Sequence, residues 1–238
     1  AQGYEIREEQ IYATFRIARA LGSGRTLLAE AGPGTGKTFA YLLPAVCFAR
    51  FKGAPVVVAS ATSLLQAQLT SPSGDIQTLS RLLNLNIQAG VAEDPASYIC
   101  EMKVRRPAPP AAPRGWDAFR AWAEVTSTGA RSEVPDVPDE LWERMAWDPS
   151  LACDTCGFRG HCHVMTARRR YREAADLLVC DHRLFTQDLL TRAEQLEAGG
   201  APLLPPYSAV VLDEGHHLAE IWQRVQGHKL DPHRLKST

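Results

Sequence analysis

The sequence predicts an α/β fold, a parallel sheet with helices on both faces, interrupted by a small inserted domain that carries cysteines. Apolar runs with the character of buried strands alternate with segments of helical periodicity, which is typical of parallel sheets covered by helices. A glycine-rich loop, AGPGTGKT at 31–38, joins one apolar run to one helical segment. From about Cys100 the composition shifts to proline-rich stretches, which indicates an insertion.

The elements before the insertion follow from their hydrophobic patterns. TLLAEA at 26–31 is expected to form a strand that leads into the glycine-rich loop, and PVVVAS at 55–60 has the pattern of a fully buried parallel strand. Pro44 lies inside the helix that follows the loop, where it removes one hydrogen bond and bends the axis. The apolar spacing predicts helices at 37–51, 62–69 and 75–84.

The insertion is expected at 100–162, between two parts of one main domain at 1–99 and 163–238. Its stretches RRPAPPAAPRG and SEVPDVPDE are too rich in proline for regular structure, and two short helices are predicted at 116–125 and 140–147. So few apolar residues do not offset the ordering entropy of so long a segment without a covalent or metal staple. The cysteines are the obvious staple.

Regular structure is expected to resume after Cys162. The patterns predict a basic helix at 164–175, a strand at 177–180, a helix from about Arg183, and a last strand that runs into the acidic sequence DEGHH at 213–217, followed by a closing helix.

The glycine-rich loop has the chemistry of a phosphate-binding loop. Glycines allow the backbone amides and the helix N-terminus to face phosphate groups, and a lysine followed by a hydroxyl residue completes the pattern. Lys37 would reach the β and γ phosphates of ATP, and the Thr38 hydroxyl would bind Mg²⁺. The residues expected to bind the nucleotide here are Gly32, Gly34, Thr35, Gly36, Lys37 and Thr38.

The acidic sequence DEGHH supplies adjacent carboxylates at the carboxyl end of a strand, where sites form in open parallel sheets. Asp213 would hold Mg²⁺ through water, and Glu214 would orient and deprotonate the attacking water. His216 completes the candidate catalytic set with Lys37. Taken alone, an Asp-Glu pair here is equally explained as charge at a helix N-terminus, and the phosphate loop favours the hydrolytic interpretation.

Composition limits the class of protein. The chain has 238 residues, 45% of them hydrophobic, and a net charge of −1, which argues neither for nor against nucleic acid. No apolar run reaches the ~20 residues of a membrane span and no secretory signal is recognisable, so we expect a cytoplasmic protein without membrane contact. Six cysteines, unevenly spaced, favour metal or cluster ligation over disulfides.

Four cysteines form a candidate metal site: Cys100, Cys153, Cys156 and Cys162. Tetrahedral Zn²⁺ and a 4Fe-4S cluster both accept four thiolates, and the spacing alone favours zinc. His161 and His163 could substitute as zinc ligands. The remaining cysteines, Cys47 in an apolar helix and Cys180 at a strand end, are expected in the core.

The order of these motifs resembles the first helicase domain of the bacterial DinG proteins, relatives of the XPD-type helicases. The resemblance rests on REEQ, EAGPGTGKT, VVVASATSLLQAQL, ASYIC, the later cysteines, ARRRYREAADLLVCDHRLF and VVLDEGHH, which cover nearly the whole chain. It implies a RecA-like domain whose Arg7 and Gln10 read the adenine and support the loop. It also implies that the cysteines hold a 4Fe-4S cluster. Asp181, where the family usually has Asn, and Gly215, where it usually has Ala, depart from the pattern.

The same resemblance implies an ATP-dependent DNA helicase that moves 5′ to 3′ on single-stranded or forked DNA. The stretch at 60–62 resembles the motif that contacts the DNA backbone, and the residues expected to contact DNA are Thr62, Lys103, Arg105, Arg168 and Arg169. A basic run such as 168–172 is also compatible with a solvated face, and the aromatic residues Tyr98, Trp116, Phe119 and Trp122 are better explained as the core of the insertion than as base-stacking groups.

A second motor domain, which in this family supplies an arginine to the ATP, is expected outside this chain, so the chain alone should unwind nothing. The alternatives are a non-catalytic nucleic-acid-binding module with a structural zinc, and a P-loop ATPase of another kind. The intact loop and acidic sequence speak against the first alternative, and the cysteine insertion speaks against the second.

Overall fold

The computed structural model describes residues 7–32, 34–107, 113–148, 151, 153–197, 199 and 202–227. The chain divides into two compact units. The first, here called the sheet unit, comprises Ala1–Val91 and Ala174–Thr238, and the second, the cysteine unit, comprises Ala92–Glu173.

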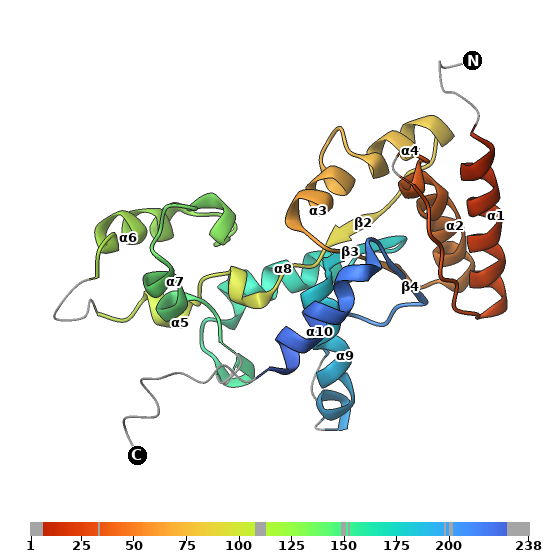
Figure 1. Cartoon of the computed structure of the whole chain (residues 1–238). Helices are drawn as coiled ribbons and strands as arrows, with labels where there is room; N and C mark the ends of the chain where they lie inside the picture. The colour runs from red at the N-terminus through yellow and green to blue at the C-terminus, as the bar shows by residue number, and fades with distance from the viewer. Residues whose placement is uncertain are drawn as a thin grey trace. The chain divides into compact units, whose positions relative to one another are not determined.

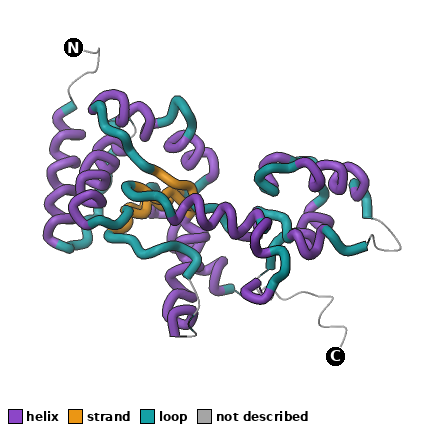
Figure 2. The backbone as a smooth tube through the Cα atoms, turned by 180° about the vertical axis from the view of Figure 1, so that it is seen from behind, coloured by secondary structure: helices purple, strands orange, loops and turns teal. Residues whose placement is uncertain are grey.

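The sheet unit is built on four parallel strands, β1 (Val56–Ser60), β2 (Ala89–Val91), β3 (Leu177–Asp181) and β4 (Ala209–Leu212), in the order β2-β3-β1-β4. The register pairs Val58 with Val179 and with Val211. Figure 2 shows the strands gathered together with helices around them. The prediction of an α/β fold with a parallel sheet is therefore confirmed.

Both faces of the two central strands are covered. Val56, Val58, Leu177 and Val179 pack with helix α2 (Lys37–Lys52) in one hydrophobic cluster. The alternate residues of β1 and β3 are just as fully buried. Because successive side chains of a strand point to opposite faces, burial of both sets explains why these segments are continuous apolar runs.

The helices of the sheet unit lie close to their predicted positions, with one unpredicted addition, α1 (Glu8–Ser23), which packs beside α2 (Figure 1). The helix α10 packs beside α9. Besides α1 and α2 the unit contains α3 (Ser63–Thr70), α4 (Asp75–Leu83), α9 (His182–Glu197) and α10 (Leu218–Gln226).

Two expectations for this unit were wrong. The segment 26–31 belongs to no strand, and Leu28 is 95% exposed. An apolar run becomes a strand only where its backbone pairs with a sheet edge, and β4 ends the described sheet without a neighbour on its outer side. Cys47 is exposed rather than buried, since an almost wholly apolar helix does not reveal from sequence which face meets solvent. Cys180 is buried as expected.

An ion pair fastens the end of α2 to the start of β3. Arg50 Nε and Nη2 donate to the two carboxylate oxygens of Asp176 at 2.9 and 3.0 Å, and the backbone N–H of Gln88 donates to the same carboxylate at 2.8 Å. Burial alone would raise the pKa of Asp176, but these hydrogen bonds hold it below its ordinary value. The contact fixes the helix that carries Lys37 against the sheet.

The cysteine unit has short helices around an aromatic core. The helices are α5 (Glu101–Val104), α6 (Trp116–Val125), α7 (Asp139–Met145) and α8 (His163–Arg172). Trp116, Phe119 and Trp142 are buried together with Ile99 and Leu141. The prediction that Trp116 and Phe119 fill a core is therefore confirmed, and Trp122 packs against the same cluster.

Among the residues that the structure describes, no helix combines the length and the apolar character that a membrane span requires.

Candidate functional site

The glycine-rich loop opens directly into α2. Gly34 and Gly36 have φ of 79° and 76°, in the left-handed region that favours glycine. Gly36 caps α2, so Lys37 and Thr38 are the first two residues of the helix, and Thr35 Oγ1 donates to the Gly32 carbonyl at 2.9 Å. Lys37 and Thr38 thus lie at the positive end of the helix dipole, as a phosphate site requires.

The start of α1 contacts the loop from the other side. The Arg7 guanidinium donates to the Gly34 carbonyl, and Gln10 Nε2 donates to the Gly36 carbonyl at 3.0 Å. A Cβ atom on Gly36 would overlap Gln10 Nε2. Both residues therefore hydrogen-bond to the backbone of the loop.

The acidic sequence follows β4 and reaches the same end of the sheet. The Asp213 N–H donates to the Ala59 carbonyl at 2.9 Å, which continues the pairing of β4 with β1. Glu214 has φ 54° and ψ 45°, a conformation uncommon for residues with a Cβ, and Gly215–His217 form a 3₁₀ turn before α10. The turn directs the Glu214 side chain back toward the loop.

The loop and the acidic sequence meet through an ion pair. Lys37 Nζ lies 3.0 Å from Glu214 Oε1, and both side chains keep about a third of their surface exposed. The hydrogen bond from Lys37 lowers the pKa of Glu214 below its ordinary value, and this outweighs the effect of burial. The pair is therefore fully ionised above the ordinary glutamate pKa and is lost only as the pH falls through the lowered value.

His216 is close to Glu214 but open to solvent. Its Nδ1 lies 3.4 Å from Glu214 Oε2, and its side chain is 67% exposed. Its ring contacts that of His217 in a tilted arrangement, with centroids 4.0 Å apart. Its nearness contributes to the lowered pKa of Glu214.

The oxygen atoms expected to bind Mg²⁺ come together at this site. Asp213 Oδ2 accepts a hydrogen bond from the Tyr41 hydroxyl at 3.1 Å, and Thr38 also interacts with that hydroxyl. Carboxylate and hydroxyl oxygens are the ligands that Mg²⁺ takes beside a nucleotide. The donor set, the glycine cradle and Lys37 fit a Mg²⁺-nucleotide. Tyr41 was not singled out from the sequence, although its position one helical turn after Lys37 places it on the same face of α2.

A buried histidine, His182, shares a backbone contact with the acidic sequence. His182 Nε2 lies 3.0 Å from the Ala59 carbonyl, the same oxygen that accepts from the Asp213 N–H. Burial lowers the pKa of His182, so the ring is neutral at neutral pH. The preceding Asp181 accepts the Leu184 N–H at 2.6 Å and so caps α9, a contact that asparagine makes equally well.

The four cysteines share the cysteine unit, but they do not form a metal site as they stand. Burial raises the pKa of Cys162, and Cys100 and Cys153 are close enough to raise it further. Trp147 Nε1 donates to Cys153 Sγ at 3.2 Å. Within the described ranges, no three His, Cys, Asp or Glu side chains are spaced to hold a metal ion.

The residues expected to contact DNA differ in their solvent exposure and in the contacts that their side chains already make. In the sheet unit, Thr62 caps α3 by accepting the Leu65 N–H. In the cysteine unit, Lys103 is only 14% exposed and donates to the Ala146 carbonyl at 2.7 Å. Arg105 pairs with Glu101. Arg168 lies over the Trp147 ring, whereas Arg169 is exposed.

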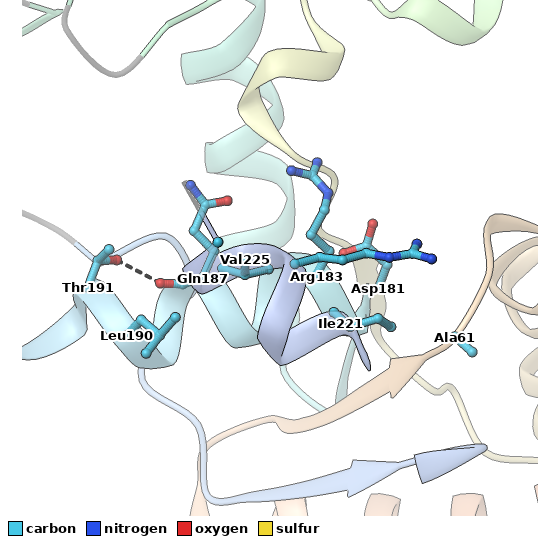
Figure 3. Close-up of a pocket in the computed structure, with 10 residues that line it drawn as sticks. Ala61, Asp181, Arg183, Gln187, Leu190, Thr191, Ile221 and Val225 are labelled. Atoms are coloured by element: carbon cyan, nitrogen blue, oxygen red, sulfur yellow. Dashed lines mark hydrogen bonds between the residues drawn. The ribbon is translucent and has the colours of Figure 1, made fainter. Parts of the chain in front are cut away.

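A pocket of about 950 Å³ lies between α9 and α10 of the sheet unit. Leu190, Ile221 and Val225 line it, and Figure 3 shows Arg183 and Asp181 beside each other. Ala61, which follows β1, also lines it. The lining of the pocket therefore includes apolar and charged side chains and extends to the end of β1.

Comparison with protein-family profiles gave no match. Curated proteins do match. The chain is 32% identical over 228 residues to the probable ATP-dependent helicase YpvA of Bacillus subtilis, across 91% of this chain and 36% of YpvA. It is 29% identical over 246 residues to the ATP-dependent DNA helicase YoaA of Escherichia coli, across 98% of this chain and 36% of YoaA. It is 29% identical over 244 residues to the ATP-dependent helicase DinG of Mycobacterium tuberculosis, across 92% of this chain and 35% of DinG.

The chain is homologous to these ATP-dependent helicases. The resemblance to DinG proteins that the motif order indicates is therefore confirmed. The chain spans about a third of the length of these helicase relatives. The alignments therefore concern only the matching third of each relative.

Alanine substitutions at Gly36, in the loop, and at Gly215, in the acidic sequence, should differ in their effect on the free energy of unfolding. Gly36→Ala is expected to lower the free energy of unfolding of the sheet unit by about 1–3 kcal/mol, because φ is positive and the new Cβ meets Gln10. Gly215→Ala should change it by no more than about 0.5 kcal/mol, since its Cβ meets Leu212 at an ordinary 3.8 Å. Urea unfolding followed by circular dichroism measures both, and equal effects would contradict the assigned geometry.

Proposed function

We propose that this chain is the ATP-binding motor domain of an ATP-dependent DNA helicase, with a RecA-like domain at 1–99 and 163–238 and an iron–sulfur domain inserted at 100–162. One observation carries the proposal. Lys37 and Glu214, 177 positions apart in the chain, form an ion pair at one end of the parallel sheet. The names of the relatives support the helicase activity.

Each residue of the site has a role in the proposed hydrolysis. The loop amides and Lys37 bind the phosphates, and Thr38 and Asp213 hold Mg²⁺, which neutralises phosphate charge when bound. Glu214 accepts a proton from the attacking water. Arg7 and Gln10 hydrogen-bond to the loop backbone, and we propose that they also contact the adenine.

The ion pair implies an order of events. The Lys37 ammonium binds phosphate oxygens less strongly while it is paired with the Glu214 carboxylate. Phosphate oxygens that take over Lys37 release the Glu214 carboxylate, which then becomes available as a base. Full activation needs a further positive charge at the γ phosphate, which we assign to an arginine of a second motor domain. We therefore propose that these 238 residues alone hydrolyse ATP slowly and do not unwind DNA.

We further propose that Cys100, Cys153, Cys156 and Cys162 bind a 4Fe-4S cluster. Its support is the shared location of the thiols in one unit and their position between the two ATP motifs. A structural zinc in a non-catalytic nucleic-acid-binding module is the alternative.

Single-stranded or forked DNA is the proposed substrate, with translocation from 5′ to 3′. In the sheet unit, the proposed contacts with the DNA backbone are Ala61, which lines the pocket between α9 and α10, and the next residue, Thr62. In the cysteine unit the exposed Arg169 is the best placed of the proposed contacts, with Arg105 and Arg168 partly engaged and Lys103 mostly buried.

Two measurements test the proposal: nucleotide binding by the wild type and two variants, and the iron content of the wild type. Equilibrium binding of a fluorescent ADP analogue with Mg²⁺ is expected for wild type and should weaken strongly in Lys37→Ala, whereas Lys52→Ala at the other end of α2 should bind normally. An anaerobic preparation should be yellow-brown and contain iron. Normal nucleotide binding by Lys37→Ala contradicts the ATP site, and a colourless protein with stoichiometric zinc favours the alternative.

A further inference from the structure

Tyr41 places a buried hydroxyl at the carboxylate of the acidic sequence. Its ring lies in the core between α2 and the sheet, and the residue is 5% exposed. Only the hydroxyl reaches the site, where it donates to Asp213 Oδ2 at 3.1 Å. The aromatic ring and the hydroxyl thus have separate surroundings, one apolar and one polar.

The hydroxyl contacts two residues of the site, Asp213 and Thr38. Burial raises the pKa of Tyr41 well above its ordinary value, and the Asp213 carboxylate raises it further. A hydrogen bond with Thr38 opposes this rise in part. The hydroxyl therefore contacts both residues that are assigned to Mg²⁺, Asp213 and Thr38.

We propose that Tyr41 is a positioning residue for Mg²⁺, holding Asp213 and Thr38 in the orientation that the metal needs. The bond engages Oδ2 of Asp213, so Oδ1 would be the oxygen through which Asp213 holds the metal. Groups that hydrogen-bond to metal ligands in this way fix their orientation, and their loss typically lowers metal affinity by about 10–100-fold. This inference rests on the proposed ATP site.

Tyr41→Phe tests the inference because it removes the hydroxyl and keeps the ring in the core. The binding of a fluorescent ADP analogue is measured in EDTA and then across a Mg²⁺ titration. We expect equal affinity in EDTA, and about a tenfold higher Mg²⁺ concentration for half-maximal enhancement in the variant. Tyr207→Phe is the matched control, since it removes a half-buried hydroxyl elsewhere in the sheet unit.

The outcomes separate the inference from the proposed function. Wild-type protein that binds no nucleotide overturns the ATP site itself. Normal binding in EDTA with an unchanged or lower Mg²⁺ requirement in Tyr41→Phe overturns the positioning role and leaves the ATP site intact. A weaker affinity already in EDTA, or a loss of thermal stability much larger than that of Tyr207→Phe, assigns Tyr41 a purely structural role and also overturns the inference.

Discussion

Replacing Glu214 with glutamine is expected to slow ATP hydrolysis by about 10²–10⁴-fold while leaving nucleotide binding intact. The amide keeps the size of the side chain but cannot accept a proton from water. It also weakens the contact with Lys37, whose ammonium then meets the phosphates without competition from a carboxylate. Nucleotide affinity should therefore be equal to or higher than that of the wild type. Single-turnover hydrolysis and binding of the fluorescent ADP analogue measure the two effects separately.

Glu220→Gln is the control for this substitution. Glu220 lies nearby on α10, is well exposed, and pairs with Arg224 rather than with a residue of the site. It should leave hydrolysis unchanged, because an exposed ion pair between neighbouring turns contributes little. If Glu214→Gln hydrolysed ATP at the wild-type rate, or lost nucleotide binding together with hydrolysis, Glu214 would not be the base.

The second large effect is expected in the cysteine unit, where Phe119→Ala should remove the centre of the aromatic core. Phe119 is fully buried between Trp116 and Trp122, with ring centroids 6.3 and 5.7 Å away. Truncating a buried phenylalanine costs about 3–5 kcal/mol. A core of this size rarely supplies more than about 3–5 kcal/mol. The cysteine unit should therefore unfold while the sheet unit still binds nucleotide.

Hydrogen exchange resolved by peptide measures this directly, with loss of protection confined to 92–173. Val125→Ala on the same helix is the control, because Val125 is exposed and its truncation removes little buried surface. Iron content, if the cluster is bound, should fall with Phe119→Ala and stay constant with Val125→Ala. Loss of protection across both units would show that they do not fold independently.

The meeting of the loop and the acidic sequence could be predicted because both motifs are local. The spacing of Gly34, Gly36 and Lys37 defines a loop that opens a helix, and the strand before Asp213 predicts carboxylates at a sheet end. In a parallel sheet the carboxyl ends of neighbouring strands lie together, so two distant motifs were expected to meet. The Lys37 to Glu214 contact fulfils that expectation.

Other features depended on partners that no local pattern identifies. Tyr41 looks like one more apolar residue of α2 until its hydroxyl is found beside Asp213, 172 positions later. The strand expected at 26–31 has the right composition, but a strand also needs a neighbouring edge. The exposed face of α2, with Cys47, could not be chosen because its apolar residues surround the helix.

By itself, the sequence determined the parallel α/β class, the end of the sheet at which the glycine-rich loop and the acidic sequence lie, and the resemblance to the helicases. These depend on periodicity and on short spacings, which the chain carries locally. Only the tertiary structure decided that Lys37 is bound by Glu214, that Tyr41 and His182 support Asp213, and which side chains are open to solvent. Such contacts join residues far apart in the chain, and their geometry is set by the packing of the sheet and its helices.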